Sequence, residues 1–259
     1  MKDYTVSACI VSYNNGDKIL NTIDSVLKNT VGVKLELYVV DNGSTDGSTE
    51  KIKSAFPSVK VIESGENNGF GAGHNKVLPL INSKYHVVIN PDIILKDDSI
   101  TKLCDFADSD SDIGLLSPKI LFENGEEQKL GKKNPTPLYL GVHFFHKNTK
   151  PSKIMDDYCM TNAGTEPFEI TNATGCFMFF KTEVFKKLGG FDERFFMYLE
   201  DCDIARRASK ISRVLHCPDI EVYHLWERAS KKSKKLLKIH IQSIIKYFLK
   251  WGITGRDRK

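Results

Sequence analysis

The sequence has 259 residues, enough for one large α/β domain or two small ones with a full hydrophobic core. Its 41% hydrophobic and 27% charged residues exclude extensive disorder, and a net charge of only +4 gives no reason to expect a nucleic-acid partner. No apolar run approaches the roughly 20 residues that span a bilayer, and the amino terminus lacks a signal core, so we expect neither membrane insertion nor export.

Six cysteines occur without a CxxC pair and at no metal-ligand spacing. This pattern indicates reduced thiols in a cytoplasmic protein, most of them small core residues. They are Cys9, Cys104, Cys159, Cys176, Cys202 and Cys217.

The first half of the chain alternates between strand and helix patterns. Short β-branched apolar runs predict strands, and apolar residues at spacings of three and four predict the helices between them. The order β-α-β-α-β-α-β favours an α/β fold with a mostly parallel sheet flanked by helices. The expected strands cover residues 4–12, 35–40, 59–63 and 87–89, and the expected helices pass through residues 19–27, 48–56 and 77–80.

Polar loops follow these strands, at the sheet edge where open α/β folds bind ligands. Residues 13–16 and 41–47 are polar, and residues 66–75 are rich in glycine. A glycine-rich loop lets a ligand approach the backbone closely, although these alternating glycines do not form the dinucleotide GxGxxG pattern. Within the second loop, Asp46 or Ser48 is expected to cap the helix that follows.

The stretch Asn90-Pro91-Asp92 ends the central strand abruptly. Because Pro91 has no N–H for the sheet ladder, the chain must leave the sheet there, which places Asp92 at the carboxyl end of the strand. A carboxylate at this edge can hold a hard cation against a phosphate. The alternative is that Asn90 and Asp92 are ordinary turn-forming residues.

The second half of the chain is less regular. Strand patterns recur at residues 113–118 and 176–180. The apolar residues in 121–169 follow neither a helical nor a strand period, so this segment is expected to form an irregular insert. Such an insert could form one wall of a substrate site, on the side of the acceptor. Two short strand patterns occur between residues 214 and 223, and His224 follows directly after them. His224 could bind a metal, and a structural role is the alternative.

Three acids after an aromatic run form a second chemical signal. Glu200 and Asp201 fall in the first turn of a predicted helix, where the helix dipole favours negative charge. Asp203 is instead expected to form ordinary helical ion pairs with Arg206 or Arg207.

Residues 228–259 form a basic tail with an amphipathic helical pattern. Two interpretations stay open: docking on an anionic membrane surface, or packing on the domain with the lysines in water. The lysines are Lys231, Lys232, Lys234, Lys235 and Lys238, and the apolar residues are Leu236, Leu237, Ile241, Ile244, Ile245, Phe248 and Trp251.

Taken together, these motifs make the chain similar to the family-2 glycosyltransferases with a GT-A fold, in particular the bacterial rhamnosyltransferase-like branch. The similarity covers nearly all of residues 4–230. It is carried by the motifs at residues 10–14, 39–46, 67–75, 90–92, 173–175 and 200–203, and by His224.

The resemblance implies a role for each motif. Asp41 would recognise the nucleotide base, Asp92 is the last acid of the family's DxD metal motif with Asn90 in place of the first, and His224 is the metal-binding histidine. Asp201 would be the catalytic base and Glu200 its acidic neighbour. The residues assigned to nucleotide-sugar binding are Ser12, Tyr13, Asn14, Asp41, Ser44, Gly69, Phe70, Asn75, Asn90, Pro91 and Gly175.

These roles imply an inverting transferase that moves a sugar from a nucleoside diphosphate, most consistently TDP-rhamnose, to a hydroxyl of a lipid-linked cell-surface polysaccharide. A divalent cation, Mg²⁺ or Mn²⁺, would offset charge on the leaving diphosphate. Residues 1–118 would bind the donor, residues 119–227 the acceptor, and residues 228–259 would hold the enzyme at the inner face of the cell membrane.

Three alternatives remain. A UDP-hexose could replace TDP-rhamnose as the donor. A nucleotidyltransferase also binds base and diphosphate, but residues 12–15 contain no cation for a phosphate loop. A non-catalytic membrane scaffold would need neither Asp92 nor Asp201.

Overall fold

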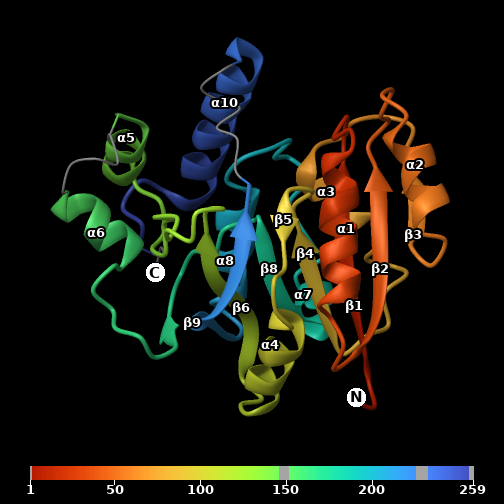
Figure 1. The fold of residues 1–259 in the computed structure, drawn as a ribbon. Coiled ribbons are helices and arrows are strands. Elements are labelled where there is room, and N and C mark those ends of the chain that lie inside the picture. Colours follow the sequence, from red (N-terminus) through yellow and green to blue (C-terminus); the bar gives the residue numbers. More distant parts are fainter. Residues whose placement is uncertain (1, 146–151, 226–232, 257–259) are drawn as a thin grey trace.

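The computed structural model describes residues 2–145, 152–225 and 233–256. Its centre is a nine-stranded sheet in the order β3-β2-β1-β4-β8-β6-β9-β5, with β7 paired to β9 (Figure 1). The strands are β1 Thr5–Ser12, β2 Lys34–Asp41, β3 Lys60–Glu63, β4 Tyr85–Ile89, β5 Ile93–Ile94, β6 Ile113–Leu121, β7 Phe168–Glu169, β8 Phe177–Lys181 and β9 Arg213–His224. The helices are α1 Lys18–Lys28, α2 Ser48–Ala55, α3 Phe70–Asn75, α4 Ser99–Asp108, α5 Pro137–Phe145, α6 Lys153–Cys159, α7 Thr182–Lys187, α8 Glu200–Ala208 and α10 Lys234–Trp251.

The expected α/β class is confirmed, and the first half of the sheet is parallel as predicted. β1 pairs in parallel with β2 and β4, and β2 pairs in parallel with β3. Beyond β4 the sheet is mixed, because β8 runs antiparallel to both β4 and β6 while β6 and β9 are parallel. A short apolar run such as β8 predicts a buried strand but not its direction.

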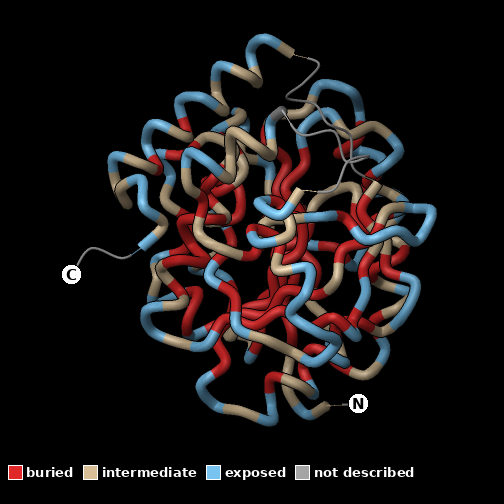
Figure 2. The backbone as a smooth tube through the Cα atoms, turned by 90° about the vertical axis from the view of Figure 1, so that its left-hand side faces the viewer, coloured by how far each residue is buried: buried red, intermediate tan, exposed pale blue. Residues whose placement is uncertain are grey.

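The central strand β4 is buried on both faces because its side chains enter two separate cores. Val87 and Ile89 belong to the larger apolar cluster, which includes residues of α1 and α4. Val88 belongs to the cluster on the other face, with residues of α7 and α8. Figure 2 shows this buried centre surrounded by exposed loops and outer helices. All six cysteines are free and buried, as expected.

Three local expectations need correction. The insert at residues 121–169, expected to be irregular, contains α5, α6 and β7, and α5 and α6 share a small apolar cluster built around Tyr158. The two short strand patterns near residues 214 and 223 form one strand, β9, which absorbs a register shift opposite Pro118 and Lys119. The third helix, α3, ends at Asn75 rather than reaching residue 80.

The C-terminal helix α10 packs on the rest of the domain. Tyr247 is fully buried in a cluster with Phe195, Leu199 and Cys202. The helix lies above the carboxyl end of the sheet, the end towards which the arrows of β2 and β9 point (Figure 1). Within the described ranges, no helix is both long and apolar enough to cross a membrane.

Candidate active site

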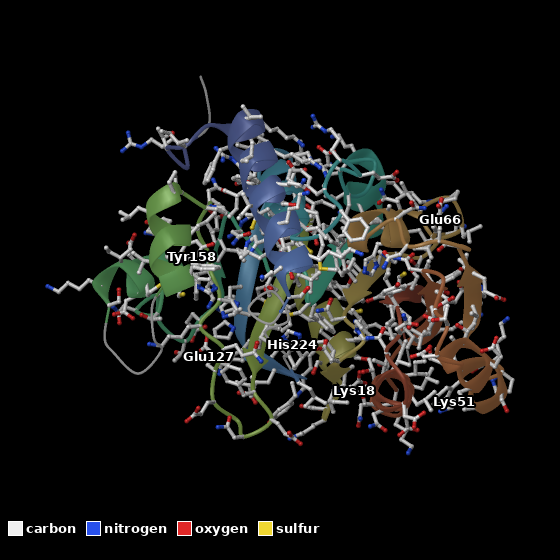
Figure 3. The ribbon with its side chains drawn as sticks, turned by 90° about the horizontal axis from the view of Figure 1, so that it is seen from above. Lys18, Lys51, Glu66, Glu127, Tyr158 and His224 are labelled. Carbon is white, nitrogen blue, oxygen red and sulfur yellow. The ribbon has the colours of Figure 1, made fainter. Side chains whose placement is uncertain are left out.

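Most of the predicted site residues lie in loops at the carboxyl edge of the parallel strands. This is the edge seen from above in Figure 3, where His224 lies near the middle, Glu66 and Lys51 lie on the side of α2, and Tyr158 lies on the side of α6. A cavity of about 580 Å³ between Ser111 and Arg213 lies at the opposite edge, among the amino ends of β6 and β9, and contains none of these residues.

The loops after β1 and β2 are tied together by Asn14. Its backbone N–H donates to Ser44 Oγ at 3.0 Å, and its side-chain Oδ1 accepts from the Thr45 N–H at 2.8 Å. Ser12 Oγ donates to Asn15 at 3.1 Å, which orders the same loop. The Tyr13 ring is 49% exposed and is therefore available to a planar ligand.

Asp41 lies at the end of β2 and is 5% exposed. Both of its carboxylate oxygens accept from the Ser44 N–H, at 3.1 and 3.2 Å. Each oxygen keeps a further lone pair, so the carboxylate can still accept a hydrogen bond from a ligand. The N-cap of α2 is Gly47 and no side chain caps this helix, so the expected cap by Asp46 or Ser48 is wrong. Asp46 instead accepts from the N–H of Ser48 within the loop.

The glycine-rich loop is close-packed against other segments, which differs from the expectation that its glycines open the backbone to a ligand. Gly69 has φ +93°, and a Cβ there would lie 2.0 Å from the carbonyl oxygen of Phe196. A Cβ on Gly71 would lie 2.7 Å from Phe191, and one on Gly73 would lie 2.7 Å from Val11. These glycines are needed because the chain itself approaches closely.

The two other residues assigned to this loop also face the protein. The Asn75 amide bonds the backbone N–H of Phe191 at 2.8 Å and its carbonyl at 2.9 Å, and it donates to Glu193. The Phe70 ring contacts the ring of Phe191 edge to face at 5.5 Å. Asn75 and Phe70 therefore fix the segment that follows residue 190, and their assignment to the nucleotide sugar stays a prediction.

Asp92 and His224 are brought together at the predicted metal position. Ile93 pairs with His224 across β5 and β9, and Asp92 Oδ1 lies 3.2 Å from His224 Nε2. Burial lowers the pKa of His224, but Cys176 and Asp92 outweigh it and raise this pKa to about 10. The imidazole is then a cation held against a carboxylate.

The same pair suits a divalent cation. Asp92 Oδ1 is buried, and its close polar neighbour among the described residues is His224 Nε2 at 3.2 Å. Carboxylate oxygen and neutral imidazole nitrogen are common metal ligands, so a bound cation would take the place of the proton on His224. In the described part of the chain, no group of three or more His, Cys, Asp or Glu side chains is arranged to hold a metal. A cation here would thus need further ligands from a donor diphosphate.

Asn90 and Pro91 shape this corner through their backbones. The Asn90 N–H donates to the carbonyl of Cys176 at 2.9 Å, and the Pro91 carbonyl accepts from Thr22 Oγ1 at 2.8 Å. The bond to Cys176 joins the end of β4 to the start of β8, immediately after Gly175.

Asp201 is held at the amino end of α8 by two backbone N–H groups. Gly175 donates to Oδ2 and Cys202 to Oδ1, both at 2.8 Å. Burial raises the pKa of Asp201, against the lowering effect of these bonds. Gly175, which was assigned to the donor, therefore touches the predicted base, and Gly175-Cys176 links this base to the metal corner.

Glu200 is buried beside Asp201. Its Oε2 has no hydrogen-bond partner among the described residues, and burial, reinforced by the charge of Asp201, raises the pKa of Glu200 well above its usual value. Asp203 instead bonds Arg207 at 2.8 Å, which confirms the expected helical ion pair.

Two residues that contact the site were not predicted from the sequence. Gln128 orients His224, since its amide lies 3.1 Å from Nδ1 and donates to the His224 carbonyl at 2.8 Å. His240 of α10 contacts the ring of Tyr198, three residues before Asp201. Gln128 lies in the aperiodic insert and His240 in the tail, so no local pattern connects either residue to the site.

Comparisons with known proteins identify the family and the fold. The model of glycosyl transferase family 2 matches residues 7–189. The N-acetylglucosaminyl-diphospho-decaprenol L-rhamnosyltransferase of Mycobacterium tuberculosis is 27% identical over 236 residues, covering 83% of this chain and 74% of that protein. The low-salt glycan biosynthesis hexosyltransferase Agl10 of Haloferax volcanii is 25% identical over 224 residues, covering 85% of this chain and 66% of that protein.

Solved structures share the fold. The mannosyltransferase PcManGT from Pyrobaculum calidifontis, in complex with GDP-Man and Mn²⁺, matches with a TM-score of 0.69 at 18% identity, over 100% of this chain and 66% of that chain. GalNAc-T7 with UDP, GalNAc and Mn²⁺ matches with a TM-score of 0.68 at 18% identity, over 97% of this chain and 49% of that chain. With the family match spanning more than half of its length, the chain belongs to glycosyl transferase family 2 and is a glycosyltransferase with a GT-A fold.

Proposed function

We propose that this enzyme transfers a sugar, with inversion, from a nucleoside diphosphate to a hydroxyl of a lipid-linked saccharide during cell-surface polysaccharide assembly. TDP-rhamnose is the favoured donor. The observation that carries the proposal is the link through Gly175-Cys176 between Asp201 and the corner formed by Asp92 and His224. It is supported by the rhamnosyltransferase relative, whose name specifies a lipid-linked acceptor.

The donor base is proposed to lie between Tyr13 and Asp41. The exposed ring of Tyr13 offers a stacking surface, and the Asp41 carboxylate can accept the ring N–H of uracil or thymine. Because Asn14 joins the two loops that carry these residues, the pocket is partly ordered before the nucleotide binds.

Asp92 and His224 are proposed to hold a divalent cation, Mg²⁺ or Mn²⁺. Such a cation neutralises the charge that develops on a departing diphosphate. Gln128 fixes the ring of His224, as groups behind metal ligands commonly do. Asn90 in place of an acid leaves one fewer negative charge at this corner, so the diphosphate itself is expected to contribute much of the attraction.

Asp201 is proposed to take the proton of the acceptor hydroxyl as that oxygen attacks the anomeric carbon. A hydroxyl is a poor nucleophile at neutral pH, and a base with a raised pKa removes its proton more readily. The N–H groups of Gly175 and Cys202 hold the carboxylate in one orientation and leave a lone pair on each oxygen. A single base and direct displacement give inversion.

The outer face of α10 is proposed to rest on an anionic membrane surface, which would bring a lipid-linked acceptor within reach. Ile241, Ile245 and Leu249 recur every four residues and are 49%, 54% and 77% exposed. Lys234 and Lys235 are exposed in the first turn of the same helix. An apolar stripe beside lysines is typical of a helix that lies in the membrane interface.

Two alternative functions are weaker. The hexosyltransferase relative from Haloferax volcanii supports a hexose as the second candidate sugar, and a UDP-hexose is the second candidate donor. A non-catalytic scaffold would not need an ordered carboxylate such as Asp201 beside Gly175, so this geometry argues against it.

The test is a transfer assay with purified enzyme, N-acetylglucosaminyl-diphospho-decaprenol in anionic vesicles, and either TDP-rhamnose or UDP-glucose. We expect labelled rhamnose in the lipid fraction with Mg²⁺ or Mn²⁺, and loss of transfer with EDTA. Transfer from UDP-glucose alone would move the donor assignment to UDP-hexoses, and no transfer from any sugar nucleotide would contradict the proposed function.

A further inference from the structure

The turn that enters α8 has a strained backbone immediately before the acidic pair. Tyr198 has φ +71° and Leu199 has φ +66°. These values lie in the left-handed region, which residues other than glycine, asparagine and aspartate rarely adopt. Glu200 and Asp201 follow directly. Two such residues in a row persist only where the surrounding structure holds them in place.

Helix α10 contacts this turn at two polar or aromatic positions. Ser243 Oγ donates a hydrogen bond of 2.7 Å to the carbonyl of Met197. The rings of His240 and Tyr198 are in contact, with their centroids 4.5 Å apart and their planes tilted by 31°. Burial lowers the pKa of His240, against the opposing charge of Asp201, so the imidazole is uncharged at neutral pH.

A third contact is apolar and completes the pattern. Tyr247 is fully buried in the same apolar cluster as Leu199. Residues 197–199 are thus tied to α10 by a hydrogen bond, a ring contact and a shared apolar cluster, in that order. His240, Ser243 and Tyr247 have the spacing i, i+3, i+7, which places them on one face of the helix. This face points at the turn, while the exposed stripe that begins at Ile241 lies on another face.

We propose that α10 is a clamp that holds the turn at residues 197–199 in its left-handed conformation and thereby positions Asp201. His240 and Ser243 are then positioning residues for the transfer reaction, and the C-terminal helix is part of the catalytic site rather than only a membrane tail. The proposal rests on the assignment of Asp201 as the base. It adds residues that act on this base from a segment far away in the sequence.

The first experiment separates turnover from donor binding. His240→Ala and Ser243→Ala should each lower kcat roughly tenfold in the transfer assay, because the turn then leaves its catalytic conformation more often. The KM for the donor should stay within twofold, because Tyr13 and Asp41, which are proposed to bind the base, lie on the loops after β1 and β2 and not on this turn. His240→Phe keeps a ring for this contact and should retain most of the activity. Gln242→Ala, on an exposed position of the same helix, is the control.

A double-mutant cycle tests whether His240 acts through Tyr198. Glycine adopts a positive φ freely, so Tyr198→Gly removes much of the need for a clamp at that position. In the Tyr198→Gly background, His240→Ala should cost less than twofold in kcat, compared with tenfold in the natural chain. An equal loss in both backgrounds, or a His240→Phe variant as impaired as His240→Ala, would show that the imidazole acts directly on the substrate and would overturn the clamp.

Hydrogen exchange provides a measurement that does not depend on turnover. In His240→Ala, amides of residues 197–203 should exchange faster while those of β1 and β4 stay protected. Unchanged exchange in this segment would contradict the clamp even if activity fell. Asp201→Asn in the same assay keeps the two proposals apart: its full activity would remove Asp201 as the base, whereas unimpaired His240 and Ser243 variants beside an inactive Asp201→Asn would remove only the clamp.

Discussion

The backbone N–H of Gly175 donates a hydrogen bond of 2.8 Å to Oδ2 of Asp201, and a Cβ on residue 175 would lie only 3.0 Å from Cβ of Asp201. The segment that leads into β8 thus fixes the carboxylate both by a hydrogen bond and by close contact. The absence of a side chain at residue 175 is part of the geometry that holds Asp201, the proposed base.

This contact predicts the effect of Gly175→Ala. The added methyl group should displace Asp201 by a few tenths of an ångström and lower kcat by roughly threefold to tenfold, since misplacement of about 1 Å can cost 100-fold. Gly141→Ala is the matched control, because a Cβ there meets no atom within 4 Å. Equal kcat values for the two variants would show that the Asp201 position tolerates the methyl group.

The two neighbouring acids should differ in their effect on turnover. Asp201→Asn should leave donor affinity nearly intact and lower single-turnover transfer by roughly 10²–10⁴-fold, the usual contribution of a general base. Because burial raises the pKa of Asp201, the natural enzyme should lose turnover as the pH falls through this raised pKa, the base being active only when deprotonated. The measurement is single-turnover transfer against pH beside donor calorimetry.

Glu200→Gln is the comparison for Asp201→Asn. The side chain of Glu200 should point about 100° away from that of Asp201 around the helix. Replacing Glu200 should therefore lower the rate of transfer less than Asp201→Asn does. Its buried Oε2 lacks a hydrogen-bond partner in the described residues, which makes it the rival candidate for the base. A larger loss of transfer in Glu200→Gln than in Asp201→Asn would therefore exchange the two roles.

Asp41 should contribute to donor affinity rather than to turnover. If the Asp41 carboxylate accepts the ring N–H of thymine or uracil, Asp41→Ala should weaken binding of TDP and UDP by about 1.5 to 3 kcal/mol, as for a hydrogen bond to a charged group. Calorimetry with each nucleotide measures this effect. Unchanged affinity for both nucleotides would place the base elsewhere.

Sequence patterns predicted the elements whose cause is local. The β-branched run at residues 87–89 and the break at Pro91 place Asp92 correctly at the end of β4, and the acidic first turn of α8 is where the residue types indicate. The pairing of Asp92 with His224 also followed from motif resemblance.

Contacts between distant segments could not be predicted in this way. Gly69 is close-packed against Phe196, which lies more than 120 residues along the chain, and no local pattern indicates this contact. The apolar pattern of α10 predicted a helix but not which of its faces meets the protein. The spacing of apolar residues shows that a helix has an apolar face, but it does not identify the segment that packs against this face.

The outer face of α10 should determine membrane binding independently of the clamp. Replacing Ile241, Ile245 and Leu249 together by serine removes the exposed apolar stripe and should reduce flotation with anionic vesicles at low salt. Gln242→Ser is the single-site control on the same helix. If the triple variant floats as well as the natural chain, the stripe is not the membrane contact.

The stability of the fold should depend on a buried uncharged histidine. His74 is fully buried between Phe70 and Phe191, its ring nitrogens have no hydrogen-bond partner among the described residues, and burial lowers its pKa well below the usual value. Because folding lowers the pKa of His74, protons bind this histidine more readily in the unfolded chain. The free energy of unfolding is therefore unaffected by His74 above its unfolded pKa of about 6.5 and decreases as the pH falls below that value.

His74→Phe should therefore flatten the pH dependence of stability. Below pH 6 each such histidine makes the free energy of unfolding fall by about 1.4 kcal/mol per pH unit, and the variant lacks one of these contributions. His86 and His216, whose pKa values burial lowers to about 3, keep theirs in both proteins, so only the difference between the curves reports on His74. Urea unfolding at pH 7, 6 and 5 measures this difference. At pH 7 the variant should be at least as stable as the natural chain, because Phe removes two buried polar atoms, and parallel curves would mean that His74 binds a proton in the folded protein.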